Sequence, residues 1–156
     1  MSKRRVIGGS KRSQRGVTLL EVMISVLILG IGMLGIAAMQ TTALRNSQSS
    51  FERSQAVMHS YAIIDAMRAN RVAALAGEYN VGMTCIAPAA GTLSQNDLRE
   101  WVISMQTGMG GGDTTCGSVN CDGGVCTVIV QWDDSRATDG AAQGDVEHKL
   151  TTVVNI

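Results

Sequence analysis

Aromatic residues and proline are scarce in this chain of 156 residues. There are one Phe, two Tyr, two Trp and a single Pro, at position 88. A core with so few rings must be built on aliphatic side chains, so we expect the folded domain to be small. The chain also lacks a Ser-His-Asp set, and its two histidines stand far apart, at positions 59 and 148. We therefore expect neither an enzyme nor a cofactor site.

Acidic residues are absent from the first 16 positions, which hold six basic side chains: Lys3, Arg4, Arg5, Lys11, Arg12 and Arg15. Because the whole chain has 13 basic and 13 acidic groups, residues 17–156 carry a formal charge of −6. A basic terminus can bind nucleic acid, but here an apolar run follows it at once. That order is typical of the cytoplasmic flank of a membrane segment. We therefore expect the basic N-terminal segment to lie beside a membrane and not to bind nucleic acid.

Charged residues are also missing between Val22 and Met39. With residues 17–20 added, the run reaches the roughly 20 residues that a helix needs to cross a bilayer. An ordinary secretory signal is the alternative. However, the run is longer than the usual 7–15 residues, and no convincing small-x-small cleavage site directly follows it. The pattern predicts a membrane helix over residues 17–40.

This apolar segment contains no proline but has three glycines, Gly30, Gly32 and Gly35. Each glycine weakens a helix by roughly 0.8–1.0 kcal/mol relative to alanine. The cluster could let the helix loosen, or it could allow another helix to approach closely. The sequence leaves both interpretations open.

Glu21 is an acidic residue close to the start of the apolar run. A carboxylate at bilayer depth costs about 2.5–3.5 kcal/mol on insertion scales, and somewhat less near the interface. If the chain is cut between Gly16 and Val17, the new ammonium group lies four residues before Glu21, one helical turn away. The carboxylate could instead pair with the ammonium of a neighbouring subunit. Either pairing would offset the cost of burying it.

The stretch from Arg15 to Val22, RGVTLLEV, resembles the processing site of type IV prepilins and type II secretion pseudopilins. The resemblance implies that a membrane peptidase cuts after Gly16 and methylates the new first residue, Val17. It makes Glu21 the fifth residue of the mature chain. Val17 departs from the family pattern, in which Phe or Met is commoner at this position.

Further residues resemble the PilV-type minor pilins, also called type IV pilus modification proteins: residues 29–35, 39–40, 47–53, Ala56 and 64–71. The resemblance implies a structural subunit of the type IV pilus that helps prime pilus assembly and lies at or near the fibre tip. It also implies support of adhesion and twitching motility. The partners would be other minor pilins, the major pilin, the prepilin peptidase/methyltransferase and the inner-membrane assembly platform. The alternatives are a minor pseudopilin of type II secretion and a single-pass membrane sensor or enzyme.

These patterns predict an α+β, pilin-like fold in which a long N-terminal helix packs on a small antiparallel sheet. Four parts follow: a cleaved leader (1–16), a membrane or fibre-core half-helix (17–40), an exported half-helix (41–76) and a periplasmic domain (77–156). The protein would span the inner membrane once and later be found in the surface fibre. We expect one helix from 17 to 76, with an apolar stripe facing the sheet: Val57, Tyr61, Ile64, Val72 and Leu75.

In the exported domain, residues 98–106 predict a short helix capped by Ser94 or Asp97, with Trp101 as an anchor. Alternating residues 126–132 and 146–156 predict strands, and residues 115–121 pair with the first of them across the turn 122–124. The sheet would have three or four strands. Residues 133–145 contain four acids but lack the ligand spacing of a calcium loop, so we expect a solvated connection.

Four cysteines follow the apolar segment: Cys85, Cys116, Cys121 and Cys126. Zinc binding is one interpretation, but there is no C-x-x-C pair and no nearby histidine. An exported domain with a small core favours disulfides instead. Three connectivities are possible, and we favour Cys121–Cys126 with Cys85–Cys116.

Overall fold

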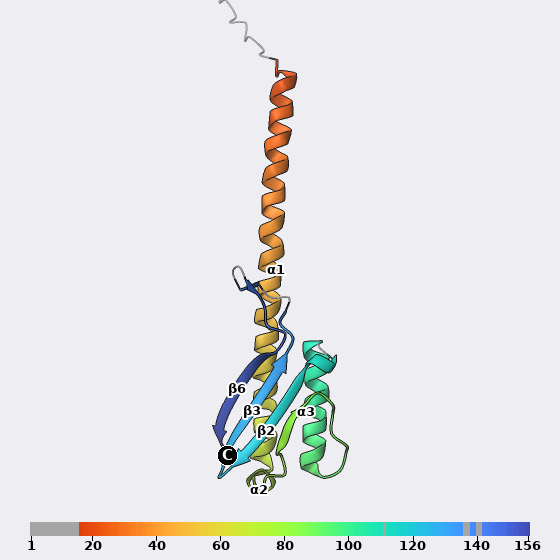
Figure 1. Cartoon of the computed structure of the whole chain (residues 1–156), viewed down its shortest axis with the longest axis vertical. Helices are drawn as coiled ribbons and strands as arrows, with labels where there is room; N and C mark the ends of the chain where they lie inside the picture. The colour runs from red at the N-terminus through yellow and green to blue at the C-terminus, as the bar shows by residue number, and fades with distance from the viewer. Residues whose placement is uncertain (1–15, 111, 136–137, 140–141) are drawn as a thin grey trace, which may run out of the picture. The chain divides into compact units, whose positions relative to one another are not determined.

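The computed structural model describes residues 16–110, 112–135, 138–139 and 142–156. The chain forms two compact units, residues 1–40 and residues 41–156. Helix α1 (Leu19–Ala69) begins in the first unit and ends in the second (Figure 1). In the second unit it packs against a four-stranded antiparallel sheet. The architecture is therefore α+β and pilin-like, as the sequence predicts.

The first unit is represented by the apolar part of α1. Every described residue from Gly16 to Gln40 is exposed. Within the described residues, α1 is the one helix that is long and apolar enough to cross a membrane. A helix that is apolar all round is stable only where lipid or other helices surround it. This segment and its sequence context suggest membrane anchoring.

Helix α1 ends earlier than the sequence predicts. The expected single helix over 17–76 is instead α1, a break at Asn70, and the short helix α2 (Arg71–Leu75). Asn70 has φ −115° and ψ 53°, outside the helical region, and its side-chain amide donates a hydrogen bond to the hydroxyl of Tyr79. Asparagine also has a low helix propensity, which favours a break at this position. Gly77, with φ +79°, then ends α2.

The buried face of α1 also differs from the predicted stripe. Of the five expected residues only Ile64 is buried, while Val72 is 83% exposed and Tyr61 54% exposed. The buried residues are Glu52, Ala56, Ser60, Ile63, Ile64 and Met67. Small side chains such as Ala56 and Ser60 let a helix approach a sheet closely, and a pattern of large apolar residues overlooks them. On the exposed side of α1, Arg68 forms an ion pair with Asp65 at 3.2 Å.

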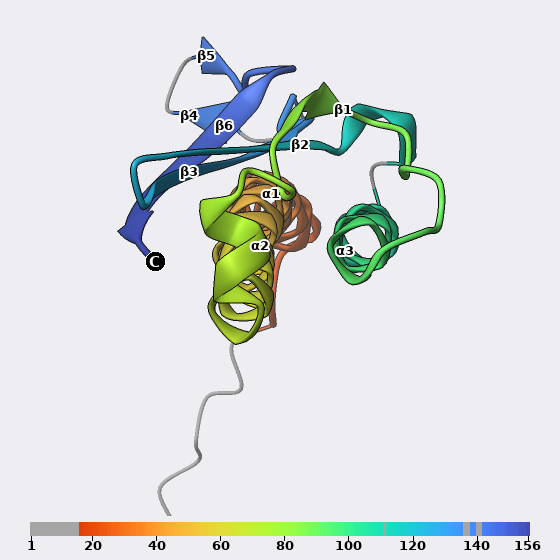
Figure 2. The same cartoon turned by 90° about the horizontal axis from the view of Figure 1, so that it is seen from below.

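Helix α3 (Leu93–Met109) lies on the same face of the sheet as α1 (Figure 2). It begins before the predicted 98–106 range because Thr92, and not Ser94 or Asp97, is the N-cap. Thr92 and Gln95 form a capping box. The helix also continues through Gly108 to Met109, and its C-cap residue, Gly110, has the left-handed conformation. Trp101 is buried, as predicted, and its indole N–H donates to the carbonyl oxygen of His59 on α1 at 2.9 Å.

The sheet consists of β1 (Val81–Thr84), β2 (Cys116–Asp122), β3 (Val125–Trp132) and β6 (His148–Asn155), in the order β1-β2-β3-β6. All three pairings are antiparallel. Gly123 and Gly124, both at positive φ, turn the chain between β2 and β3. The predicted hairpin is confirmed, and Cys121 lies opposite Cys126 in its register. The short strands β4 (Thr138–Asp139) and β5 (Ala142–Gln143) form a separate pair that the sequence did not predict.

The core lies between the inner face of the sheet and the two helices. The predicted alternation in β3 is confirmed, since Cys126, Val128, Val130 and Trp132 are all buried. Gly117 on β2 is required for close packing, because a Cβ there would meet the Trp101 ring and lie 2.8 Å from the methyl carbon of Met105. Beside α3, the buried hydroxyl of Tyr79 donates a hydrogen bond to the carboxylate of Asp97. Burial and this hydrogen bond raise the pKa of Tyr79 to about 12.

His59 connects α1 to α3 and makes the second unit sensitive to acid. Burial lowers the pKa of His59 below its ordinary value of 6.5. Its Nε2 is buried without a hydrogen-bond partner among the described residues, and Gly108 of α3 lies against it. The unfolded chain therefore binds a proton more readily than the folded chain between the lowered pKa and 6.5. Stability should be full above pH 6.5 and should fall as the pH drops below it.

Replacing His59 by glutamine is expected to flatten this dependence. The full chain in detergent can be unfolded with urea between pH 5 and 8 while tryptophan fluorescence is recorded. The wild type should lose stability toward pH 5, and the His59→Gln variant should lose less. An unchanged slope in His59→Gln would refute the assignment.

Candidate processing and assembly site

The predicted cleavage bond lies just before the first residue of α1. Gly16, Val17 and Thr18 have no regular secondary structure, and all three are exposed. A Cβ placed on Gly16 would meet nothing within 4 Å in the described residues. Residues 1–15 lie outside the described residues, so the predicted basic leader is represented by Gly16 alone. The Gly16–Val17 bond is thus exposed on the chain described here.

Thr18 begins the helix. Its carbonyl oxygen accepts hydrogen bonds from the backbone N–H of Glu21 at 3.1 Å and of Val22 at 3.3 Å. Its hydroxyl oxygen also accepts from the Glu21 N–H, at 3.3 Å. This is the geometry of an N-cap, which satisfies a backbone donor that the first turn leaves free. The sequence analysis missed this role, although Thr18 and Glu21 have the T-x-x-E spacing of a capping box.

Glu21 is the acidic residue in the first turn of α1. A negative charge there is favoured by the positive end of the helix dipole. Its side chain is exposed, and within the described part of the chain it has no ion-pair partner. In the uncut chain Val17 carries an amide nitrogen, which is uncharged, so the predicted pair with an ammonium group cannot form before cleavage. The carboxylate is available to a group that processing or assembly supplies.

The three glycines of the apolar segment, Gly30, Gly32 and Gly35, lie in continuous helix. Among the described residues, a Cβ added to any of them would meet nothing within 4 Å. Helix loosening and close helix–helix approach both concern the assembled or membrane state. Both roles therefore stay predictions.

One family model matches the chain. It is described as the prokaryotic N-terminal methylation motif, and it covers residues 11–37. The motif supports a type IV pilin-like or pseudopilin-like protein. It includes Gly16, Val17, Glu21 and all three glycines, and it implies assembly with other pilins and processing by a prepilin peptidase. No curated protein and no solved structure gives a significant match.

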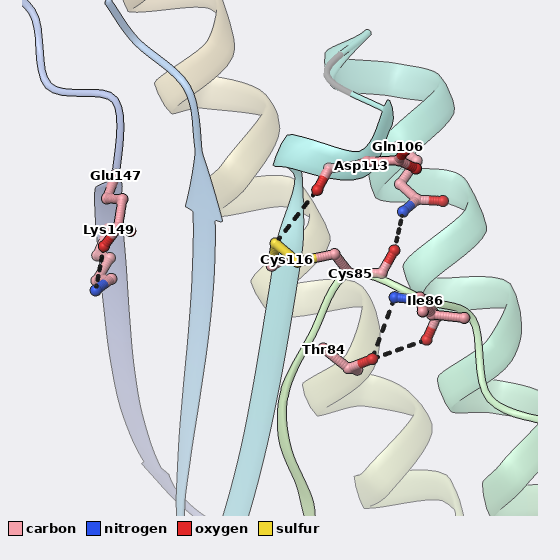
Figure 3. The surroundings of a disulfide bond; sticks show 8 residues. All are labelled: Thr84, Cys85, Ile86, Gln106, Asp113, Cys116, Glu147 and Lys149. Atoms are coloured by element: carbon pink, nitrogen blue, oxygen red, sulfur yellow. Dashed lines mark hydrogen bonds and ion pairs between the residues drawn. A yellow bond between two sulfur atoms is a disulfide. The ribbon is translucent and has the colours of Figure 1, made fainter.

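The four cysteines lie in the second unit and form two disulfides, Cys85–Cys116 and Cys121–Cys126. This is the pairing that the sequence analysis favoured. The first bond joins the loop after β1 to β2, beside the hydrogen bond that Gln106 of α3 donates to the carbonyl oxygen of Cys85 at 2.6 Å (Figure 3). The second joins directly opposed residues of β2 and β3. All four cysteines are used in these two bonds.

No group of three or more metal-ligating side chains is found in the described residues. The proposed calcium alternative at 133–145 falls partly outside them, at 136–137 and 140–141. A pocket of about 310 Å³ lies nearby in the second unit, lined among others by Glu52, Thr115 and Trp132. The hydroxyl of Thr115 and the indole N–H of Trp132 have no hydrogen-bond partner within the described residues. Sequence reasoning could not find this pocket, because its residues come from separate elements that meet only in the fold.

Proposed function

We propose that this protein is a minor pilin, a structural subunit that enters the type IV pilus through its apolar helix. One observation carries the proposal. An exposed, non-helical Gly16–Val17 bond directly precedes a capped apolar helix with an unpaired carboxylate at its third residue. The methylation motif spans this whole arrangement. Cleavage at this bond followed by assembly would use each of these parts.

Cleavage between Gly16 and Val17 would change the electrostatics of the helix end. It removes a strongly basic segment and leaves one ammonium group at Val17, close to the Glu21 carboxylate. In a medium of low dielectric constant, opposite charges one helical turn apart attract each other strongly. A pair formed with the ammonium of a neighbouring subunit would fix how far one helix slides along the other. The carboxylate would then determine the register of the assembly.

The remaining parts of the chain follow from this arrangement. Residues 1–16 would be the leader, 17–40 the membrane and fibre-core segment, 41–76 the exported segment that holds the rest of α1 and α2, and 77–156 the periplasmic domain. Two disulfides in so small a domain suit an oxidising compartment. The PilV-type resemblance favours a place at or near the fibre tip, with other minor pilins, the major pilin and the inner-membrane platform as partners. Adhesion and twitching motility would depend on it indirectly.

Fibres sheared from the cell surface provide the test. An antibody against the second unit is expected to detect the mature chain in these fibres and not the form with its leader. The signal should disappear in cells that lack the pilus assembly platform and persist in cells that lack type II secretion. The reverse dependence would assign the chain to secretion as a pseudopilin. Persistence in both mutants, or an unprocessed chain confined to the membrane, would contradict the proposal.

A further inference from the structure

The scissile bond and the first helical turn are separated by very little chain. Leu19 is the first residue of α1, and only Val17 lies between the Gly16–Val17 bond and the cap residue Thr18. A peptidase must reach the carbonyl carbon of the bond it cuts. A bond inside a helical turn is enclosed by the turn, with its carbonyl engaged in an i to i+4 hydrogen bond. The place where this helix starts therefore decides whether the bond is accessible.

We propose that Thr18 positions the cleavage site, because its hydroxyl fixes the start of α1 and keeps the Gly16–Val17 bond in non-helical backbone. The inference deepens the proposed function and rests on it, since it assumes that the chain is cut at this bond. Thr18 acts through the backbone and not by touching the peptidase. The hydroxyl accepts from the Glu21 N–H, so it stabilises the helix that starts at Leu19 over one that starts earlier.

Without the cap, the residues upstream would let the helix start earlier. Valine and alanine are poor N-caps, whereas glycine is tolerated at that position. Gly16 is the nearest acceptable N-cap residue upstream of Thr18. A helix capped by Gly16 would have Val17 as its first helical residue. The scissile bond would then join the cap to the helix itself. Loss of the Thr18 hydroxyl should therefore lower the fraction of molecules that present an accessible bond.

The test is the rate of leader removal from the full-length chain, measured by pulse-chase in cells that express the peptidase. Thr18→Val keeps the shape but cannot accept the hydrogen bond, while Thr18→Asn changes the shape and remains a good cap. Processing of Thr18→Val is expected to slow by up to about fivefold, because losing one N-cap changes the equilibrium constant between the two helix starts about fivefold. Thr18→Asn should stay within about twofold of the wild type on the same scale. The opposite order would mean that the peptidase recognises the side chain itself, which overturns the proposal.

A second pair of variants separates helix start from other effects of residue 18. Proline at position 19 disfavours helical backbone at the residue before it and fits the first helical position. In a Leu19→Pro background the helix start is fixed independently of the cap, so Thr18→Val should have no further effect on the processing rate. The same loss in both backgrounds would refute the role of the cap. If the wild type itself is not cut between Gly16 and Val17, the proposed function fails, whereas equal rates for all correctly cut variants overturn this inference alone.

Discussion

Replacing Glu21 by alanine is expected to leave leader removal intact and to lower incorporation into fibres about tenfold or more. An effect of this size corresponds to about 1.4 kcal/mol, less than the roughly 3–5 kcal/mol that removal of one partner from a buried ion pair can cost. Gly16 and Val17 are unchanged in the variant, so the peptidase still meets its bond. The mature chain should accumulate in the membrane while its share in sheared fibres falls.

The physical reason is the cost of the carboxylate. Glu21 has no ion-pair partner among the described residues of one chain, although it lies at the edge of an apolar segment. Insertion scales assign about 2.5–3.5 kcal/mol to such a charge at the bilayer centre. Alanine would remove that cost, so the variant should anchor in the membrane at least as well as the wild type. Only the contact between subunits should suffer.

Ser25→Ala is the matched control, one helical turn beyond Glu21. The Ser25 hydroxyl donates to the carbonyl oxygen of Glu21 at 2.7 Å, a local contact that alanine loses without any change in charge. This variant should both mature and assemble like the wild type. Normal assembly of Glu21→Ala would show that the carboxylate has no part in register, and the same defect in both variants would point to a general disturbance of the helix.

Removing the Cys85–Cys116 disulfide is expected to destabilise the second unit more than removing Cys121–Cys126. The bonded residues are 31 apart in the first pair and five apart in the second. The loop-entropy relation gives contributions of about 3.7 kcal/mol for the longer loop and about 2.1 kcal/mol for the shorter one. Each pair has one buried member, Cys116 and Cys126, so the loss of packing is similar in the two.

Double alanine variants of each pair provide the measurement. Urea unfolding of the full chain in detergent, followed by the fluorescence of the buried Trp101 and Trp132, gives both free energies of unfolding. Cys85→Ala/Cys116→Ala should lie below Cys121→Ala/Cys126→Ala by roughly 1.6 kcal/mol on the same relation. An equal or reversed order would mean that direct support of the β2–β3 hairpin outweighs the constraint on the unfolded chain.

The N-terminal arrangement was largely predictable because each part has a local signal. A charge-free run, one early carboxylate and a basic leader can be read along the chain without knowing the fold. The cap was the exception: Thr18 and Glu21 show the capping-box spacing, but the sequence analysis judged Glu21 by its charge alone. The same spacing at Thr92 and Gln95 would have placed the start of α3 correctly.

The second unit was predictable where alternation and turn residues agree. The hairpin of β2 and β3 has alternating apolar residues on one arm and Gly123–Gly124 at its turn, and its register is as expected. Strand β1 was missed because it has only four residues and no alternation in its burial. The buried face of α1 was wrongly predicted because Glu52, Ala56 and Ser60 are buried by the fold in spite of their size or polarity. Contacts between residues distant in sequence, such as the hydrogen bond from Trp101 to the carbonyl oxygen of His59, leave no periodic signal.

The identity of the first residue of the mature chain is the decisive test of processing at the Gly16–Val17 bond. The protein should be extracted from membranes and from sheared fibres, and its intact mass measured. We expect a chain that starts at Val17, carries one additional methyl group at its N-terminus and lacks all of residues 1–16. A chain that keeps its leader, or one cut within or after the apolar segment, would contradict the link between the Gly16–Val17 bond, the ammonium it creates and Glu21.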